Sequence, residues 1–363
     1  MNLLEPGPLR LPAEWAPRSS TWIAWPHERS DWPGKFSPVH WVFAEVVRIL
    51  AEYEQVNILV DNSLVEERVI DRLVKSDVDL SFVSFYAIET DRVWLRDTGP
   101  MIVLPDAEPG SDPQASARAI AWNFNGWAKY ENHKRDARIA ATIADHLKLP
   151  THAPIYDFEG RRMRFTLEGG AIDVDGLGTL LTTEECLLSP IQERNPGLER
   201  TAVERILAAE LGVRQIIWLN RGIAGDDTHG HVDDIARFVA PGVIVAAYEN
   251  SSSDENHEPL VENLDRLRRA RDLAGEPFEI VALPMPRPVY FDEQRLPASY
   301  ANFYIASKVV LVPTFNDPAD RIALETLEPL FPGREIVGVY CRDLVLGLGT
   351  LHCMTRDVPI FVR

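Results

Sequence analysis

The sequence predicts a mixed α/β fold built from repeated units. Polar motifs lead into apolar strand-like runs, tight-turn signals separate paired runs, and amphipathic segments with helical spacing follow. Units of this kind at nearly even intervals favour radial repetition around an axis, as in propellers. From the spacing alone, an irregular α/β domain is an equal alternative.

The hairpins are the clearest predicted elements. Residues 167–188 (LEGGAIDVDGLGTLLTTEECLL) contain Asp175–Gly176, a strong signal for a tight turn between two strands. Residues 231–248 repeat the pattern with Pro241–Gly242 at the turn, and residues 298–315 resemble it. Fragments of the pattern occur in 94–104 and 347–363.

The segments between the hairpins read as helices and loops. Residues 39–53 and 200–212 carry apolar side chains at helical spacing. Residues 104–119 are predicted to form an exposed excursion between two strands, and 249–259 a polar loop that opens a helix. No linker divides the chain, so we expect one domain over residues 1–363.

The composition of the 363 residues indicates a globular protein of the cytoplasm. Three widely spaced cysteines, Cys186, Cys341 and Cys353, form no CxxC pair, which argues against a disulfide framework or zinc ribbon. The formal charge of −18 argues against nucleic-acid binding. Neither a signal peptide nor an apolar run of membrane-spanning length is present, so we expect no membrane partner.

A dense polar cluster in residues 225–238 (GDDTHGHVDDIARF) is the first candidate for chemistry. In an extended segment, alternate side chains share a face, and these are Asp227, His229, His231 and Asp233. Burying them is costly unless a ligand or metal uses them. The cluster could hold a divalent metal, or His231 could be a general acid/base beside aspartates that bind a cation. A solvated turn is the simpler alternative.

Cys353 is the second candidate. A lone cysteine near an apolar terminus is more often a core thiol, and Cys186 and Cys341 are assigned to that class. His352 precedes Cys353, but neighbours in a strand point to opposite faces, so His352 is a poor base for it. His231 is the obvious distant imidazole, and a Cys–His pair is the usual way to activate a sulfur nucleophile.

Carboxylates in two further motifs complete the candidate site. Asp97 lies in VWLRDTGP, and Glu168 precedes two glycines that allow a backbone to approach a ligand closely. With Asp233 they would face one thiol and one imidazole, and paired carboxylates match the N–H donors of a guanidinium. Trp94 could cover the face of such a cation, although a core role fits it equally well.

Several long motifs, in order, resemble those of the agmatine deiminase family, which includes bacterial peptidylarginine deiminase-type enzymes. They are PAEWAPRSSTWIAWPH, WLRDTGP, EGGAIDVDGLGTLLTTEECLL, RNP, GHVDD, ASYANFYIA, FPGREIVGV and LHCMT, spread over residues 11–353. The resemblance implies a five-bladed pseudo-symmetric α/β propeller of the guanidine-modifying (pentein) superfamily, with ββαβ-like repeats around a central site. It also implies hydrolysis of a guanidinium without metal or other cofactor.

The resemblance assigns a role to each candidate residue. Cys353 matches the nucleophile and His231 the acid/base, while Asp97, Glu168 and Asp233 match the carboxylates that bind the guanidinium or orient the histidine. The expected reaction converts agmatine to N-carbamoylputrescine and ammonia through a thiouronium intermediate on Cys353. Members specific for agmatine often have GHVDN and GGGNIHCITQQQP where this chain has GHVDD and GLGTLHCMTRDVP. These differences affect the expected substrate more than the expected chemistry.

Other functions stay open at this stage. A deiminase of arginine or peptidyl-arginine would need a group for the substrate carboxylate or peptide, with Arg96 and Arg356 as candidates. A metal-dependent hydrolase would use His229, His231 and Asp233, and a non-catalytic guanidinium-binding protein would release no ammonia. The expected partner is a small cationic guanidine, and a homodimer is considered as the oligomeric state.

Overall fold

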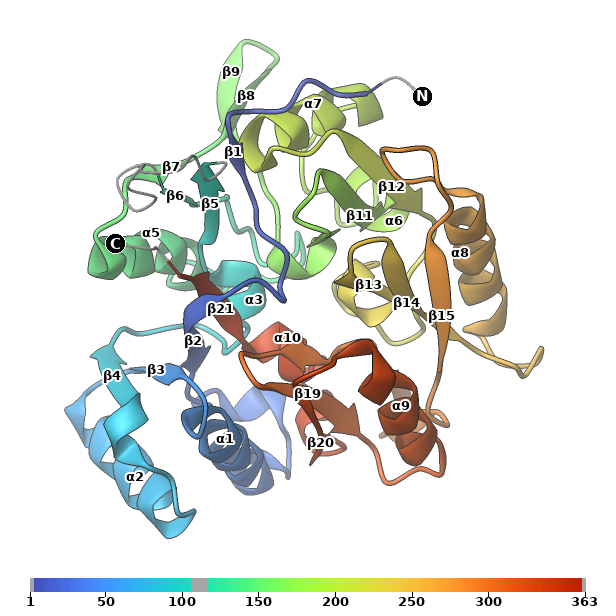
Figure 1. Ribbon diagram of the computed structural model, residues 1–363. Coiled ribbons are helices and arrows are strands. Elements are labelled where there is room, and N and C mark those ends of the chain that lie inside the picture. Colours follow the sequence, from blue (N-terminus) through green and yellow to red (C-terminus); the bar gives the residue numbers. More distant parts are fainter. Residues whose placement is uncertain (1–2, 106–116, 361–363) are drawn as a thin grey trace.

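The structure, a computed structural model, describes residues 3–105 and 117–360. It is a mixed α/β fold in which sheets surround the centre of the molecule, where the short helices α3 (Leu95–Thr98) and α10 (Leu351–Met354) lie (Figure 1). The predicted excursion at 104–119 falls largely on residues outside the described ranges.

Three sheets share one pairing pattern. In each, the first strand pairs antiparallel with the second, which pairs parallel with the third. Their strands are β10 (Asp173–Val174), β11 (Thr179–Thr183) and β12 (Gln215–Leu219); β13 (Ala236–Ala240), β14 (Val243–Tyr248) and β15 (Glu279–Pro284); and β18 (Tyr304–Ile305), β19 (Val309–Thr314) and β20 (Glu335–Tyr340). A parallel pair needs a crossover connection, which contains α7 (Arg200–Leu211), α8 (His257–Arg269) and α9 (Ala319–Leu327), respectively.

Two four-stranded sheets extend the same pattern. One has the order β1-β5-β6-β7 and the other β21-β2-β3-β4. Their strands are β1 (Leu9–Arg10), β5 (Met101–Pro105), β6 (Arg118–Ile120), β7 (Thr151–His152), β21 (Arg356–Pro359), β2 (Arg18–Ala24), β3 (Gln55–Val60) and β4 (Val83–Ala87). The crossover helices are α5 (Asp136–Leu147), α1 (Phe36–Ala51) and α2 (Ser63–Lys75). The antiparallel pair β2–β21 joins residues from the two ends of the chain in one sheet.

The predicted hairpins are confirmed. Asp175 Oδ1 accepts from the amides of Leu177 and Thr179, and Gly176 has φ +68°, a conformation that glycine adopts without strain. Gly242, with φ +76°, turns the chain between β13 and β14. The helices expected over 39–53 and 200–212 correspond to α1 and α7.

One local prediction is wrong. The segment around Cys353 was expected to be a strand, but it forms the single helical turn α10, and β21 begins only at Arg356. Leu348, in a left-handed conformation with φ +69°, and Thr350, with φ −134° and ψ −138°, turn the chain before this helix. In consequence His352 and Cys353 are neighbours on a helical turn, where side chains are not forced onto opposite faces.

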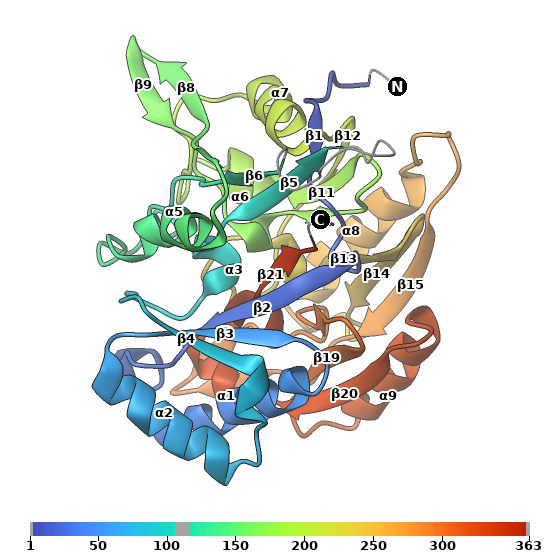
Figure 2. The same ribbon diagram turned by 60° about the vertical axis from the view of Figure 1, so that its left-hand side comes forward.

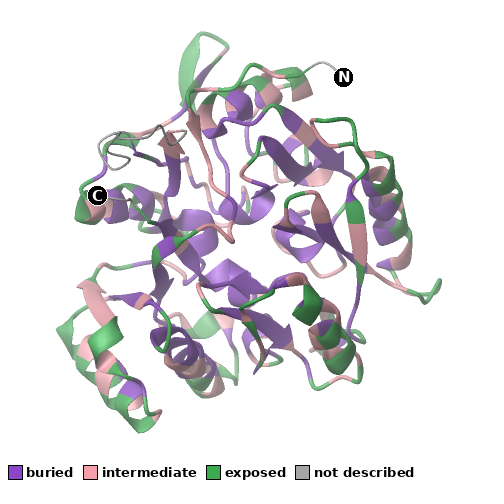
Figure 3. Ribbon diagram, in the orientation of Figure 1, coloured by how far each residue is buried: buried purple, intermediate pink, exposed green. Residues whose placement is uncertain are grey.

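The hydrophobic core lies between the sheets and their outer helices (Figure 3). Helix α1 shows how the sequence places it, because Val39, Phe43, Val46, Val47 and Leu50 recur at helical spacing and are fully buried. Each such side chain stabilises the fold by about 1.5–3 kcal/mol. Two strand pairs extend the body: β8 (Ile155–Phe158) with β9 (Arg161–Arg164), which projects from it (Figure 2), and β16 (Val289–Phe291) with β17 (Gln294–Leu296).

No helix in residues 3–105 and 117–360 combines the length and the apolar character that a bilayer crossing requires.

Candidate active site

The five residues predicted to carry the chemistry converge at the centre of the molecule. Asp97 lies on α3, Glu168 directly before the short helix η3 (Gly169–Ala171), and His231 directly before η4 (Val232–Asp234), which carries Asp233. Cys353 lies on α10. Every one of these residues is less than a tenth exposed, so the fold holds five polar or ionisable groups away from bulk water.

Gly170 allows the side chains to meet. A Cβ atom on this residue would lie 2.5 Å from His231 Nδ1, 3.0 Å from Asp233 Oδ2 and 3.1 Å from Asp97 Oδ1. Any larger residue would therefore displace the site. The backbone approach expected from the glycine pair is present, and it brings the Gly170 amide to Asp97 Oδ1 at 2.9 Å.

Asp97 is fixed at both carboxylate oxygens. Gly170 N donates to Oδ1, and Trp127 Nε1 donates to Oδ2 at 2.9 Å. Burial raises the pKa of Asp97 above its ordinary value, with Asp233 and Glu168 adding to the rise and His231 opposing it. The orientation of this carboxylate is thus set before any ligand binds.

His231 is surrounded by carboxylates. Its Nδ1 lies 3.9 Å from Asp97 Oδ1 and 4.0 Å from Asp233 Oδ1, and its Nε2 lies 3.8 Å from Glu168 Oε2. Burial alone would lower the pKa of His231, but Asp97 foremost, and then Cys186 and Glu168, raise it well above its ordinary value. Neither ring nitrogen has a hydrogen-bond partner among the described residues. The surroundings of the imidazole therefore favour its protonated form.

Glu168 is held ionised by Arg194. The guanidinium donates from Nε to Glu168 Oε1 at 2.9 Å and from Nη1 to the carbonyl of Gln192 at 2.8 Å, and both side chains of the ion pair are completely buried. Burial opposes ionisation of Glu168, but Arg194 and His231 together lower its pKa to about 2. Glu168 thus presents a fixed negative charge to His231.

The sulfur of Cys353 contacts one amide and one carboxylate. Asn302 Nδ2 donates to its sulfur at 3.1 Å, and Asp233 Oδ2 lies 3.8 Å from the same atom. Burial raises the pKa of the thiol well above its ordinary value, and Asp233, Asp234 and Asp97 raise it further. A cation beside these acids would remove part of this penalty on the thiolate.

The site opens into a cavity of about 410 Å³. Cys353, Asp97 and Trp94 line it, while His231, Glu168 and Asp233 are buried and adjoin these lining residues. The other charged side chains along the wall are Asp31, Arg92, Asp227 and Asp292. The cavity therefore offers a path from solvent to the sulfur.

The prediction that the alternate residues from Asp227 to Asp233 share one face of an extended segment is wrong. His229 has φ +64°, which turns the chain, and its ring lies near Ser189 Oγ at 3.2 Å and Glu185 Oε1 at 4.0 Å. Asp227 instead contacts Lys129 and Tyr130. His229 and His231 thus do not face a common metal position.

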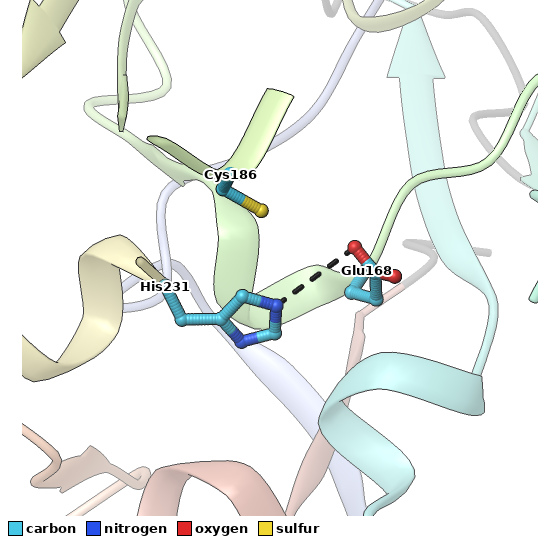
Figure 4. Close-up of side chains that lie close together, drawn as sticks. All are labelled: Glu168, Cys186 and His231. Atoms are coloured by element: carbon cyan, nitrogen blue, oxygen red, sulfur yellow. Dashed lines mark ion pairs between the residues drawn. The ribbon is translucent and has the colours of Figure 1, made fainter. Parts of the chain in front are cut away.

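A different trio has the composition of a metal site. One ligand atom each from Glu168, Cys186 and His231 lies within 4.8 Å of the others (Figure 4). Cys186, expected to be a plain core thiol, is buried on α6 (Glu184–Leu188) but lies beside the site. Arg194 already neutralises Glu168, so a divalent cation here would meet a fixed positive charge.

Five supporting residues were not among the predicted site residues: Glu14, Trp127, Arg194, Asn302 and His352. Arg194, Asn302 and Glu14 lie in the motifs RNP, ASYANFYIA and PAEW, so the motifs that carry the resemblance contained them. Trp127 had no such signal.

Arg96 and Arg356, the candidates for a substrate carboxylate, line a separate cavity of about 50 Å³. Arg96 pairs with Asp357 at 3.1 Å, and Arg356 Nε donates to the carbonyl of Pro100 at 2.7 Å. Both are therefore committed to structural contacts away from the cavity of Cys353.

Comparison with known proteins agrees with this architecture. The agmatine deiminase of Pseudomonas fluorescens SBW25 is 34% identical, and the match covers 96% of this chain and 95% of that protein. The structure of the agmatine deiminase of Enterococcus faecalis superposes with a TM-score of 0.85 at 29% identity, covering 98% and 97% of the two chains. An amidinotransferase of Microseira wollei, with a TM-score of 0.54 at 13% identity over 97% of each chain, shares the fold. The Porphyromonas-type peptidyl-arginine deiminase family matches residues 10–359, and the chain belongs to this family.

Proposed function

We propose that this protein hydrolyses agmatine to N-carbamoylputrescine and ammonia. The observation that carries the proposal is the convergence of a thiol, an imidazole and three carboxylates beside one cavity. Similarity to agmatine deiminases over nearly the whole chain supports it.

The guanidinium would bind between Asp97 and Asp233. Asp97 lines the cavity, and Asp233 Oδ1 is a buried acceptor without a hydrogen-bond partner among the described residues. Carboxylates match the fork of N–H donors on a guanidinium and keep it protonated, so its central carbon stays electrophilic. Trp94, on the cavity wall, would cover the planar face of the cation.

The reaction would proceed in two halves. As the substrate cation binds beside the acids, the thiol of Cys353 would lose its proton to solvent through the cavity. The resulting thiolate would attack the central carbon, and His231 would protonate the departing nitrogen, so that ammonia leaves and an S-alkylthiouronium remains. Water, deprotonated by His231, then adds to this carbon, the C–S bond breaks, and the urea product leaves. His231 acts first as acid and then as base, a contribution worth about 10²–10⁴-fold.

The charges along the cavity favour a substrate with a distal amine over one with a carboxylate. Arg92 is the arginine on the described wall, and it is already engaged by Asp31 at 3.6 Å, by Asn132 and by the ring of Tyr130. The acidic residues outnumber it. An arginine or peptidyl-arginine substrate would bring its negative or bulky group against this wall without a free cation to meet it.

Mass spectrometry of the protein quenched during turnover with agmatine tests the proposal. We expect an amidine-type mass increment on Cys353 in the wild type and neither increment nor ammonia in Cys353→Ser. Ammonia release by Cys353→Ser at the normal rate would refute the covalent route. A parallel assay with arginine and a peptidyl-arginine decides the substrate, and agmatine should give the highest kcat/KM.

The metal-dependent alternative rests on the Glu168, Cys186 and His231 trio. Dialysis against EDTA separates it from the thiol mechanism. Full activity after dialysis supports the thiol mechanism, whereas loss of activity restored by a divalent ion would support the alternative.

We further propose that the sheets form a five-bladed propeller and that the chain, residues 1–363, makes one catalytic domain. The repeated antiparallel-then-parallel pairing in five sheets supports this description. The cytoplasmic location, the absence of a cofactor and the homodimer stay predictions.

A further inference from the structure

The two carboxylate oxygens of Asp233 have different surroundings. Its Oδ2 contacts His352 Nδ1 at 2.7 Å, while Oδ1 has no hydrogen-bond partner among the described residues. The side chain is completely buried. The contact with His352 thus leaves one carboxylate oxygen of Asp233 available for a ligand.

The second nitrogen of His352 also faces a carboxylate. Its Nε2 lies 2.7 Å from Glu14 Oε2. A carboxylate accepts hydrogen bonds only, so both ring nitrogens must carry hydrogen if both acids are ionised. With both ring nitrogens directed at carboxylates, His352 has no nitrogen left to act as a base for the neighbouring Cys353.

Glu14 is anchored independently of His352. Its Oε1 accepts from the amide of Ile305 at 2.7 Å, and its Oε2 accepts from Arg237 Nη2 at 2.6 Å. Arg96 Nη2 approaches the same oxygen at 3.6 Å. The side chain is nine-tenths buried. Glu14, on the segment between β1 and β2, is therefore held in place by other residues and can fix the position of the His352 ring.

We propose that Glu14 and His352 are positioning residues that orient the carboxylate of Asp233 toward the guanidinium. Glu14 fixes the ring of His352, this ring holds Asp233 Oδ2, and Oδ1 is left to accept from the substrate cation. The inference rests on the proposed function, because it assigns the support of the same guanidinium site. The low pKa of Asp233 is consistent with it: burial raises this pKa, but the hydrogen bond and charge of His352 and the charges of His231 and Arg237 lower it below the ordinary value.

Two substitutions separate the contacts of His352. In Asn, the side-chain amide nitrogen lies near the former Nδ1, so His352→Asn can still donate to Asp233 but does not reach Glu14. In Gln, the amide nitrogen lies near the former Nε2, so His352→Gln can still donate to Glu14 but leaves Asp233 Oδ2 without its donor. Both variants are neutral, so the pair isolates geometry from charge.

Alkylation of Cys353 in the full-length protein tests the proposal, because the preference of the thiol for a cationic reagent would not change if His352 had only a structural role. One reagent is a haloacetamidine, a planar cation, and the other is neutral iodoacetamide. The rate constants for Cys353 are measured by peptide mass spectrometry, and the ratio of cationic to neutral reagent reports how well the acids receive a cation. His257→Gln is the matched control, since His257 lies at the start of α8 and contacts the carbonyl of Glu249.

We expect the wild type and His257→Gln to favour the cationic reagent equally. The ratio should fall about tenfold or more in His352→Gln, because a charge-assisted hydrogen bond to Asp233 is lost, and clearly less in His352→Asn. Glu14→Gln should lower it too, and this nearly isosteric variant provides the test if His352→Gln does not fold.

An unchanged ratio in both His352→Gln and Glu14→Gln would overturn the inference, as would an equal fall in His352→Asn and His352→Gln. Equal slowing of both reagents would also overturn it, since it would mean that His352 only shapes the surroundings of the sulfur. A wild type without preference for the cationic reagent would instead contradict the proposed guanidinium site itself.

Discussion

Replacement of Asp97 by Asn tests the guanidinium site most directly, because it removes one charge and almost no volume. The wild-type carboxylate accepts from Gly170 N and Trp127 Nε1, both at 2.9 Å, and faces the cavity. An amide has one accepting oxygen, so its NH₂ group must face one of these donors. Asp97→Asn thus loses both the charge that is proposed to meet the substrate cation and the geometry that orients it.

The size of the effect follows from these contacts. A hydrogen bond to a charged group contributes about 1.5–3 kcal/mol. At about 1.36 kcal/mol for each factor of ten, kcat/KM should fall by roughly 10- to 150-fold. The pKa of His231 should fall as well, because Asp97 is the carboxylate that raises it most. On the alkaline side of the pH profile, the variant should therefore lose activity at a lower pH than the wild type.

The assay is steady-state ammonia release from agmatine across pH, with the melting temperature measured in parallel. The free energy of unfolding should change little, because the lost hydrogen bond and the removal of a buried charge oppose each other. Asp175→Asn is the matched control: Asp175 is also buried and accepts from two backbone amides, but it lies in the β10–β11 turn. Unchanged kcat/KM in a folded Asp97→Asn, or an equal loss in Asp175→Asn, would refute the assignment.

Three further changes should behave as follows. Trp127→Phe removes the donor to Asp97 Oδ2, so kcat/KM should fall about tenfold in the ammonia assay, and an unchanged value would remove Trp127 from the site. Iodoacetamide should label Cys353 slowly at neutral pH and faster as the pH rises past 9, because the raised pKa of the thiol keeps the thiolate scarce. Peptide mass spectrometry at several pH values measures the labelling rate. A rate that does not depend on pH would contradict this expectation. Arg194→Met should lower the free energy of unfolding by about 3–5 kcal/mol in urea titrations at pH 7, since Glu168 is left buried and unpaired. The pKa of Glu168 is lowered to about 2, so its ion pair stabilises the wild type above the unfolded pKa of 4.5 and is lost as pH falls toward 2; an equal acid sensitivity of both proteins would argue against this ion pair.

The sequence predicted the turns and helices that depend on residues close together in the chain. The turns at Asp175–Gly176 and Pro241–Gly242 and the helices α1 and α7 depend on near neighbours, so residue type and periodicity sufficed. The convergence of Asp97, Glu168, His231, Asp233 and Cys353 followed from the motifs and the family resemblance. Their closeness could not be derived from spacing, because it depends on how the sheets pack.

The errors arose where tertiary contacts decide the backbone. The period-two pattern suggested a shared face through His229, but the positive φ of that residue breaks the strand. Cys353 was assigned to a strand, but the strand β21 begins only after it. The apolar residues next to Cys353 belong to the helical turn α10. Glu14 and Arg194 act through partners far away in the chain, so neither local pattern nor composition could assign their contacts.

The pairing of β2 with β21 bears on how the enzyme is made. His231, Asp97 and Glu168 leave the ribosome well before Cys353, and the strand that follows Cys353, Arg356–Pro359, pairs with Arg18–Ala24, which is synthesised much earlier. The proposed active site can therefore assemble only after translation has passed this strand. A chain stalled ahead of residue 353 would lack the proposed nucleophile and should liberate no ammonia.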